Sequence, residues 1–168
     1  MTPLIIRPAA VEDVSSIVGV RLGAITEQEI KGFSAPEFAL YSSIEKLQTH
    51  WDKGNRLKDG FEVFVAEDEG KIVGFIAFKM KRNCGYIDNI VVAKEKQRQS
   101  IGRKLVTHVE MSAKSQRINQ IMTDTTENAD GTPWRSYNFW IRLGYKDTGE
   151  RLPTKYNFKE IPLIKRLI

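Results

Sequence analysis

One stretch of the sequence decides the fold: Ile87-Asp-Asn-Ile-Val-Val-Ala-Lys-Glu-Lys-Gln97-Arg-Gln-Ser100-Ile-Gly102-Arg-Lys-Leu105-Val106. Its first part is rich in β-branched residues, which favour a strand. A polar turn follows, and beyond Ser100 apolar residues recur at helical spacing, at Ile101, Leu105, Val106, Val109 and Met111. The stretch therefore predicts a strand, a turn and an amphipathic helix that begins near Ser100.

The turn in this stretch has the features of an anion-binding site. Small residues at Ser100 and Gly102 allow a ligand to approach the backbone closely. The first amides of the following helix have no intrahelical partner and lie at the positive end of the helix dipole. Basic side chains add positive charge here, namely Arg98, Arg103 and Lys104. A pyrophosphate would fit such a turn, and the alternative is a turn that only starts a helix.

The rest of the chain predicts an α/β domain with a mixed sheet, because strands and helices alternate. Short β-branched and aromatic runs predict strands at Leu4–Arg7, Phe61–Ala66, Lys71–Met80, Tyr86–Ala93 and Ile118–Thr126, with extended structure from Tyr145 onward. Helical spacing predicts helices after Pro8 as far as Leu22, around Ala35–Leu40, at Ser43–Trp51 and at Trp134–Leu143, with a polar turn at Lys53–Gly60. The second and third strands should form an antiparallel hairpin.

Length and composition indicate one soluble domain. A length of 168 residues fits one domain, and 41% hydrophobic with 28% charged residues is an ordinary globular composition. No apolar run approaches the roughly 18–20 residues that span a bilayer, and the start of the chain lacks a secretion signal. We therefore expect a single domain over residues 1–168, a cytoplasmic location and no membrane partner.

The charge pattern and the few metal-binding side chains argue against two other classes of site. The net charge of +5 is spread along the chain without a long basic block or interleaved aromatic residues, so no specific nucleic-acid partner is expected. Cys84 is the only cysteine, and the two histidines, His50 and His108, lie far apart in the sequence. Neither a metal site nor an internal disulfide is expected.

The turn and the segments around it resemble a known family. Gln97-x-x-Ser100-x-Gly102 is similar to the Gln/Arg-x-x-Gly-x-Gly/Ala signature of the GNAT superfamily of acyl-CoA-dependent N-acyltransferases. The strand before the turn, the helix after it and Phe139-Trp-Ile-Arg-Leu-Gly-Tyr145 keep the order of that family's elements. Ser100 departs from the pattern, which prefers Gly, so a positive φ there would add strain. The resemblance covers nearly the whole chain and implies a mixed, mostly antiparallel sheet that is splayed in a V and flanked by helices.

The resemblance implies acetyl-CoA as the acetyl donor. Its pyrophosphate would bind at Gln97, Arg98, Gln99, Ser100, Ile101, Gly102, Arg103 and Lys104. The backbone of Ile90, Val91 and Val92 would hold the pantetheine arm, and one of their N–H groups would polarise the thioester carbonyl. Asn128 would replace the family's arm-binding Asn, and Trp140, which stands at the position of a family Tyr, would pack beside the cofactor sulfur.

Acetyl transfer to an amine requires groups that take up and supply protons. Asp88, which shares a strand face with Tyr86, is the candidate base, directly or through a water molecule; the alternative is a turn cap or a surface ion pair. Tyr137, one helical turn before Trp140, is the candidate acid. The alternatives for Tyr137 are an ordinary packed aromatic side chain and a thiolate that leaves without a dedicated acid.

The acceptor is expected to be a primary amine of a small molecule or of a protein or peptide. Acidic residues between positions 26 and 60 would tolerate a cationic amine, or they form solvated helix faces: Glu27, Glu29, Glu37 and Glu45. The alternative function is a non-enzymatic acyl-CoA-binding regulatory module. A homodimer is one option for the oligomeric state.

Overall fold

The computed structural model describes residues 2–26 and 40–168. The chain divides into two compact units, Met1–Lys79 with Asn89–Val109 and Met80–Asp88 with Glu110–Ile168. The helical piece expected around Ala35–Leu40 lies, apart from Leu40, outside the described residues, as do Glu27, Glu29 and Glu37.

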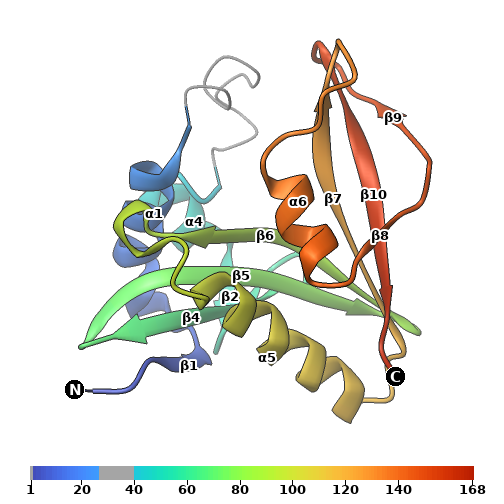
Figure 1. Cartoon of the computed structure of the whole chain (residues 1–168). Coiled ribbons are helices and arrows are strands. Elements are labelled where there is room, and N and C mark those ends of the chain that lie inside the picture. Colours follow the sequence, from blue (N-terminus) through green and yellow to red (C-terminus); the bar gives the residue numbers. More distant parts are fainter. Residues whose placement is uncertain (1, 27–39) are drawn as a thin grey trace. The chain divides into compact units, whose positions relative to one another are not determined.

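The first unit contains an antiparallel group of strands. Its elements are β1 (Ile5–Pro8), α1 (Val14–Ala24), α4 (Ile44–His50), β2 (Trp51–Lys53), β3 (Arg56–Leu57), β4 (Glu62–Asp68) and most of β5 (Lys71–Lys81). Neighbouring strands follow the order β2-β3-β4-β5, and β1 pairs with β4. The predicted hairpin is confirmed, because β4 and β5 pair antiparallel and lie side by side in Figure 1.

The second unit contains the remaining strands, and two elements besides β5 run from one unit into the other. These two are β6 (Cys84–Val92) and α5 (Ile101–Ser115); the others are β7 (Gln120–Asn128), α6 (Ser136–Arg142), β8 (Lys146–Asp147), β9 (Leu152–Pro153) and β10 (Phe158–Arg166). Strand β6 pairs with β7 in parallel, whereas β7 pairs antiparallel with β10 along its whole length. The prediction of a mixed, mostly antiparallel sheet with helices is therefore confirmed. Its splay depends on how the two units are arranged and stays a prediction.

Gly74 of β5 allows the end of β6 and the start of α5 to pack closely against this strand. A Cβ atom at Gly74 would lie 3.0 Å from the carbonyl oxygen of Val91, 3.3 Å from Cδ1 of Leu105 and 3.6 Å from Cγ2 of Ile101. A backbone oxygen at such a distance cannot move aside as a side chain can. Four residues of the predicted apolar helix face are buried, as expected: Ile101, Leu105, Val106 and Val109. Met111, which was also expected on this face, is exposed.

The segment Lys53–Gly60, predicted as a polar turn, forms part of a small hairpin. Trp51 is buried, and its indole Nε1 donates a hydrogen bond of 2.9 Å to the carbonyl of Gly54. Gly54 itself has a φ of 57°, a left-handed conformation that Gly adopts without strain. The prediction missed β2 and β3 because they are only two or three residues long.

Helix α6 begins at Ser136, two positions later than the prediction that placed its start at Trp134. Trp134 belongs instead to the loop after β7. Its backbone N–H donates to the carbonyl of Thr126 at 2.8 Å, and its indole Nε1 donates to Oδ1 of Asn128 at 2.8 Å. These bonds hold Trp134 outside the helix.

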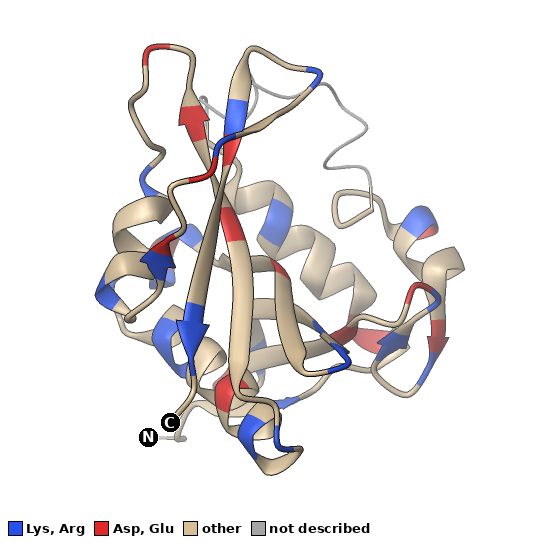
Figure 2. Cartoon of the chain, turned by 90° about the vertical axis from the view of Figure 1, so that its right-hand side faces the viewer, with Lys and Arg blue, Asp and Glu red and all other residues tan. Residues whose placement is uncertain are grey.

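Acidic and basic positions are interspersed along the described strands and helices, and neither sign fills an element (Figure 2). In residues 2–26 and 40–168, no helix has the combination of length and apolarity required to cross a membrane. The single domain, the cytoplasmic location, the absence of a nucleic-acid partner and the oligomeric state stay predictions.

Candidate functional site

The predicted anion site is the link between β6 and α5 in the first unit. After a short 3-10 helix at Lys94–Lys96, Arg98 and Ser100 adopt left-handed backbone conformations with φ of 64° and 63°. The first helical hydrogen bond of α5 runs from the Lys104 N–H to the Ser100 carbonyl at 3.0 Å. The amides that precede this bond have no intrahelical partner; they belong to Ile101, Gly102 and Arg103.

This geometry suits an anion. Alternating left-handed residues turn successive N–H groups toward one side of the chain, and such concavities bind phosphate groups. Ser100 has the positive φ that was considered from the sequence, and this conformation costs a non-glycine residue about 1 kcal/mol. Side chains in the turn are exposed to solvent, among them Arg98, Gln99, Ser100, Arg103 and Lys104.

Gln97 ties the turn to the end of β6. Its side-chain amide Nε2 donates to the carbonyl of Val92 at 3.1 Å. Val91 is buried, whereas Ile90 and Val92 are half-buried. Gln97 therefore fixes the turn against the strand residues for which a role in pantetheine binding was predicted.

Asp88 is the last residue of β6 that belongs to the second unit, and its side chain is exposed. Tyr86, two residues earlier on the same strand face, donates a hydrogen bond from its hydroxyl to the carboxylate of Asp124 on β7. Burial raises the pKa of Asp124 above its ordinary value, and the bond from Tyr86 offsets part of this rise. Burial is also the main reason why the pKa of Tyr86 is raised.

Asp124 is a functional candidate that the sequence prediction missed. Burial raises the pKa of Glu160 on β10, and the negative charge of Asp124 adds to the effect. A signal was present, because Asp124 interrupts a strand of β-branched residues and Asp is depleted in strands. Its partner, Tyr86, is 38 residues away in the sequence, so the pairing itself could not be deduced from that signal.

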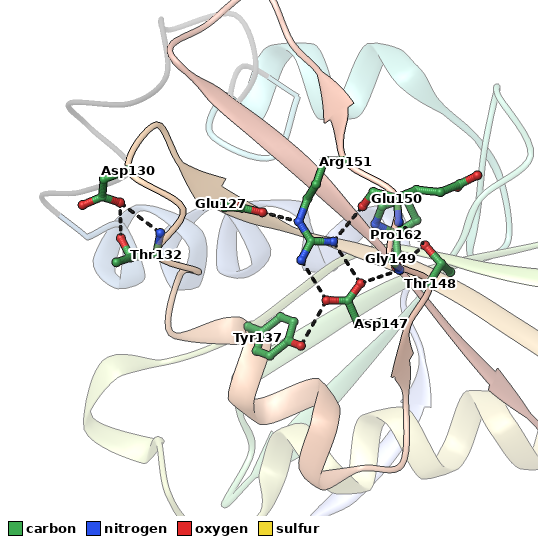
Figure 3. A network of polar contacts seen from close by, with 10 residues as sticks. All are labelled: Glu127, Asp130, Thr132, Tyr137, Asp147, Thr148, Gly149, Glu150, Arg151 and Pro162. Carbon is green, nitrogen blue, oxygen red and sulfur yellow. Dashed lines mark hydrogen bonds and ion pairs between the residues drawn. The ribbon is translucent and has the colours of Figure 1, made fainter.

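Tyr137, the candidate acid, belongs to a polar network near the surface (Figure 3). Its hydroxyl donates to Oδ2 of Asp147 at 3.1 Å. Asp147 is held by both terminal nitrogens of Arg151, each at 2.9 Å, and Arg151 also forms an ion pair with Glu127. Arg151 is the main cause that lowers the pKa of Asp147 to about 2, whereas partial burial and Asp147 raise the pKa of Tyr137.

The other two predicted contacts of the cofactor also lie in the second unit. Asn128, the last residue of β7, donates from Nδ2 to Thr132 at 3.1 Å and accepts from Trp134, so both ends of its amide are bonded to the loop that follows. Trp140 is buried and packs edge-on against Tyr145, with ring centroids 4.9 Å apart. Packing of Trp140 is thus observed, and its contact with a cofactor, like that of Asn128, stays a prediction.

The first unit also has an open hollow of about 490 Å³ between α1, the β4–β5 turn and the residues just after β6. The guanidinium of Arg7 on its wall is held by Asp13 at 2.8 Å and Glu67 at 2.9 Å. The hollow includes Ala93 and Lys94 but none of the turn residues from 97 onward. It is therefore distinct from the predicted anion site.

Comparison with known proteins identifies the family of this arrangement. The family described as "Acetyltransferase (GNAT) family" matches residues 26–145. No curated protein matches the sequence.

Solved structures share the fold. The PaiA N-acetyltransferase of Thermoplasma acidophilum in complex with coenzyme A is 17% identical, with a TM-score of 0.71 and coverage of 98% of this chain and 99% of that one. The ribosomal-protein-S18-alanine N-acetyltransferase of Escherichia coli is 15% identical, with a TM-score of 0.68 and coverage of 98% and 94%. Ard1 of Thermoplasma volcanium is 18% identical, with a TM-score of 0.71 and 99% coverage of both chains. At these identities the likeness is one of fold.

Proposed function

Because this chain belongs to the GNAT acetyltransferase family, we propose that it transfers the acetyl group of acetyl-CoA directly to a primary amine of a small molecule, protein or peptide. The observation that carries the proposal is the turn between β6 and α5. Left-handed residues at Arg98 and Ser100 lead directly into a helix whose first amides have no intrahelical partner. A pyrophosphate on these amides would gain their hydrogen bonds and the helix dipole.

The turn residues also supply contacts that suit the rest of the cofactor phosphates. Arg98, Arg103 and Lys104 are exposed cations around the free amides, and the Ser100 hydroxyl can donate to a phosphate oxygen. The matched family region includes the turn, the whole of α5 and the helix that carries Trp140. A relative with the same fold was solved as a coenzyme A complex, which supports the choice of ligand.

For proton transfer, Asp88 and Tyr137 remain the candidates chosen from the sequence. Asp88 is exposed on β6 and can receive a proton directly or through water. Tyr137 could supply the proton of the departing thiolate, although its hydroxyl donates to Asp147. A thiolate protonated by solvent is the alternative.

The donor site is tested by ligand-induced stabilisation. Acetyl-CoA should raise the Tm of the full chain, and Gly102→Asp should abolish the rise, because a carboxylate in the turn repels the pyrophosphate. The matched control is Gly19→Asp, which adds the same charge at an exposed position of α1 where a Cβ has open space. An unchanged response of a folded Gly102→Asp protein would move the cofactor away from this turn.

Turnover separates an enzyme from the alternative, a non-enzymatic acyl-CoA-binding module. Thiol release from acetyl-CoA should be measured with 1,4-diaminobutane, kanamycin and a lysine-containing peptide with a free N-terminus. Release with any of them supports amine acetylation and selects the acceptor class. Binding of acetyl-CoA without release from any acceptor would favour the binding module.

A further inference from the structure

The strand register places several proton-binding side chains on one face of the second unit. Strand β6 pairs Tyr86 with Met122 of β7, and β7 pairs Thr126 with Glu160 of β10. Paired residues of neighbouring strands point to the same side, and every second residue along a strand does so as well. Tyr86, Asp124 and Glu160 therefore share one face, together with Asp88.

Helix α6 lies against the opposite face of β7. The hydroxyl of Thr125, which alternates with Asp124, is within 2.5 Å of the Ser136 hydroxyl of α6. Thr123, also on that face, donates to the carbonyl of Ile87 at 3.0 Å. Asp124 therefore lies on the face that α6 leaves uncovered.

The surroundings of the Tyr86–Asp124 pair favour the uptake of a proton by the Asp124 carboxylate. Asp124 is shielded, and burial raises its pKa. Within residues 2–26 and 40–168, no Lys or Arg bonds to it. The negative charges of Asp124, Asp88 and Glu160, in addition to burial, raise the pKa of Tyr86 and so keep its phenol protonated. A base is most effective when its pKa approaches the working pH, which favours a shielded carboxyl over an exposed one.

Given the acetyl transfer proposed above, we infer that Tyr86 and Asp124 form a relay that takes the proton of the acceptor amine. The amine nitrogen forms its bond to the thioester carbon, and its surplus proton passes to the Tyr86 oxygen while the Tyr86 hydroxyl proton passes to the Asp124 carboxylate. Collapse of the tetrahedral intermediate breaks the carbon–sulfur bond, and the thiolate takes a proton from solvent. Asp124 then returns its proton to water. Tyr86 contacts the amine, and Asp124 acts through Tyr86.

The relay is tested with Tyr86→Phe, Asp124→Asn and the double variant, using the acceptor from the three-compound screen that gives the highest turnover. Each single change should lower kcat/KM at pH 7 by about 10²-fold, a typical contribution of general base catalysis. The double variant should lose at most about threefold more, because members of one relay are not additive. The losses should shrink as pH rises, since hydroxide replaces the missing acceptor.

Three controls distinguish the relay from a structural effect. Far-UV circular dichroism and the Tm rise with acetyl-CoA should match the wild type, and Asp124→Asn keeps the side-chain shape if Tyr86→Phe fails to fold. Glu160→Gln, which removes a carboxylate from the same face without touching the Tyr86–Asp124 bond, should change kcat/KM by less than about threefold. The kcat/KM of Asp88→Asn tests the alternative in which Asp88 is the base.

The outcomes are distinct. Losses that multiply in the double variant, or a loss that stays constant with pH, would overturn the relay. Full activity of Asp124→Asn beside a large loss in Asp88→Asn would assign the base to Asp88. A wild-type protein that binds acetyl-CoA and acetylates none of the acceptors would overturn the enzyme proposal and the relay together, whereas active variants of an active enzyme would overturn the relay alone.

Discussion

Tyr86 donates a hydrogen bond to Asp124, and Tyr137 donates one to Asp147, yet the pKa values of the two carboxyl groups move in opposite directions. Asp147 accepts two bonds from Arg151, which dominates the lowering of its pKa to about 2. Asp124 is shielded by its strand neighbours, and burial raises its pKa. Each pair consists of a Tyr and an Asp, so the surroundings decide how readily the carboxylate binds a proton.

The comparison assigns different tasks to the two tyrosines. The carboxylate of Asp147 stays ionised at neutral pH, so it does not take up a proton from Tyr137. The network in Figure 3, which links α6 with the segment after β8 and with β7, is suited to holding those segments together. Tyr86 and Asp124 have the higher proton affinity that a base requires.

Among changes to the surroundings of the two pairs, the largest expected effect comes from giving Asp124 the kind of partner that Asp147 has. Glu160→Lys places an ammonium group on the face of Asp124, which should lower the pKa of this carboxyl. We expect kcat/KM at pH 7 to fall about tenfold, because a weaker base takes up the proton less readily. The pH profile of kcat/KM measures the effect, and its acidic limb should move to lower pH. A profile that coincides with that of Glu160→Gln would contradict the role of Asp124.

A smaller effect follows from removing the cation from the other pair. A carboxyl group whose pKa is lowered on folding contributes stability that is present above its ordinary pKa of 3.8 and is lost as pH falls toward about 2. Arg151→Ala should lower the free energy of unfolding by about 1 kcal/mol at pH 7, a value discounted because Arg151 is largely exposed.

Urea denaturation at pH 7 and pH 2 measures this loss, which should nearly vanish at the lower pH. Arg166→Ala, at an exposed position near the end of β10, is the control for removal of a surface cation. An equal loss in both variants at pH 7 would mean that the Arg151–Asp147 contact adds no stability of its own.

The smallest expected effect is a gain in stability, opposite in sign to the loss expected for Arg151→Ala. A carboxyl group whose pKa is raised on folding stabilises the protein at low pH, and this contribution is lost as pH rises through the folded-state pKa. Asp124→Asn should therefore raise the free energy of unfolding by about 0.5 kcal/mol at pH 7 and leave it unchanged near pH 3. Urea denaturation at both pH values provides the measurement. A destabilised variant at pH 7 would indicate that the ionised carboxylate contributes more through Tyr86 than burial costs.

Much of the first unit could be predicted from the sequence because its signals are local. The alternation of apolar residues gives β4 and β5, and the spacing of Ile101, Leu105 and Val109 gives α5. From the sequence, only the cost of a positive φ at Ser100 could be stated, because a serine does not by itself indicate a left-handed backbone. Local patterns therefore located the turn, and the structure supplied its geometry.

The second unit was harder to predict because its decisive contacts join distant segments. Trp134 fits a helical pattern, but its bonds to Thr126 and Asn128 hold it in a loop. Asp147 lies beyond α6 and fixes the hydroxyl of Tyr137, a candidate acid whose partner the sequence did not suggest. Contacts of this kind depend on strand register, which no short motif encodes.

The close approach at Gly74 has a consequence for mutational tolerance. A library with every amino acid at this position should retain almost only glycine, because any Cβ would lie 3.0 Å from the Val91 oxygen. A selection scored by activity would then rank Gly74 beside the residues that handle the cofactor, although it has no side chain that could take part in the chemistry. Its intolerance would reflect the spacing between β5 and both the end of β6 and the start of α5, so a scan scored for folding should show the same intolerance.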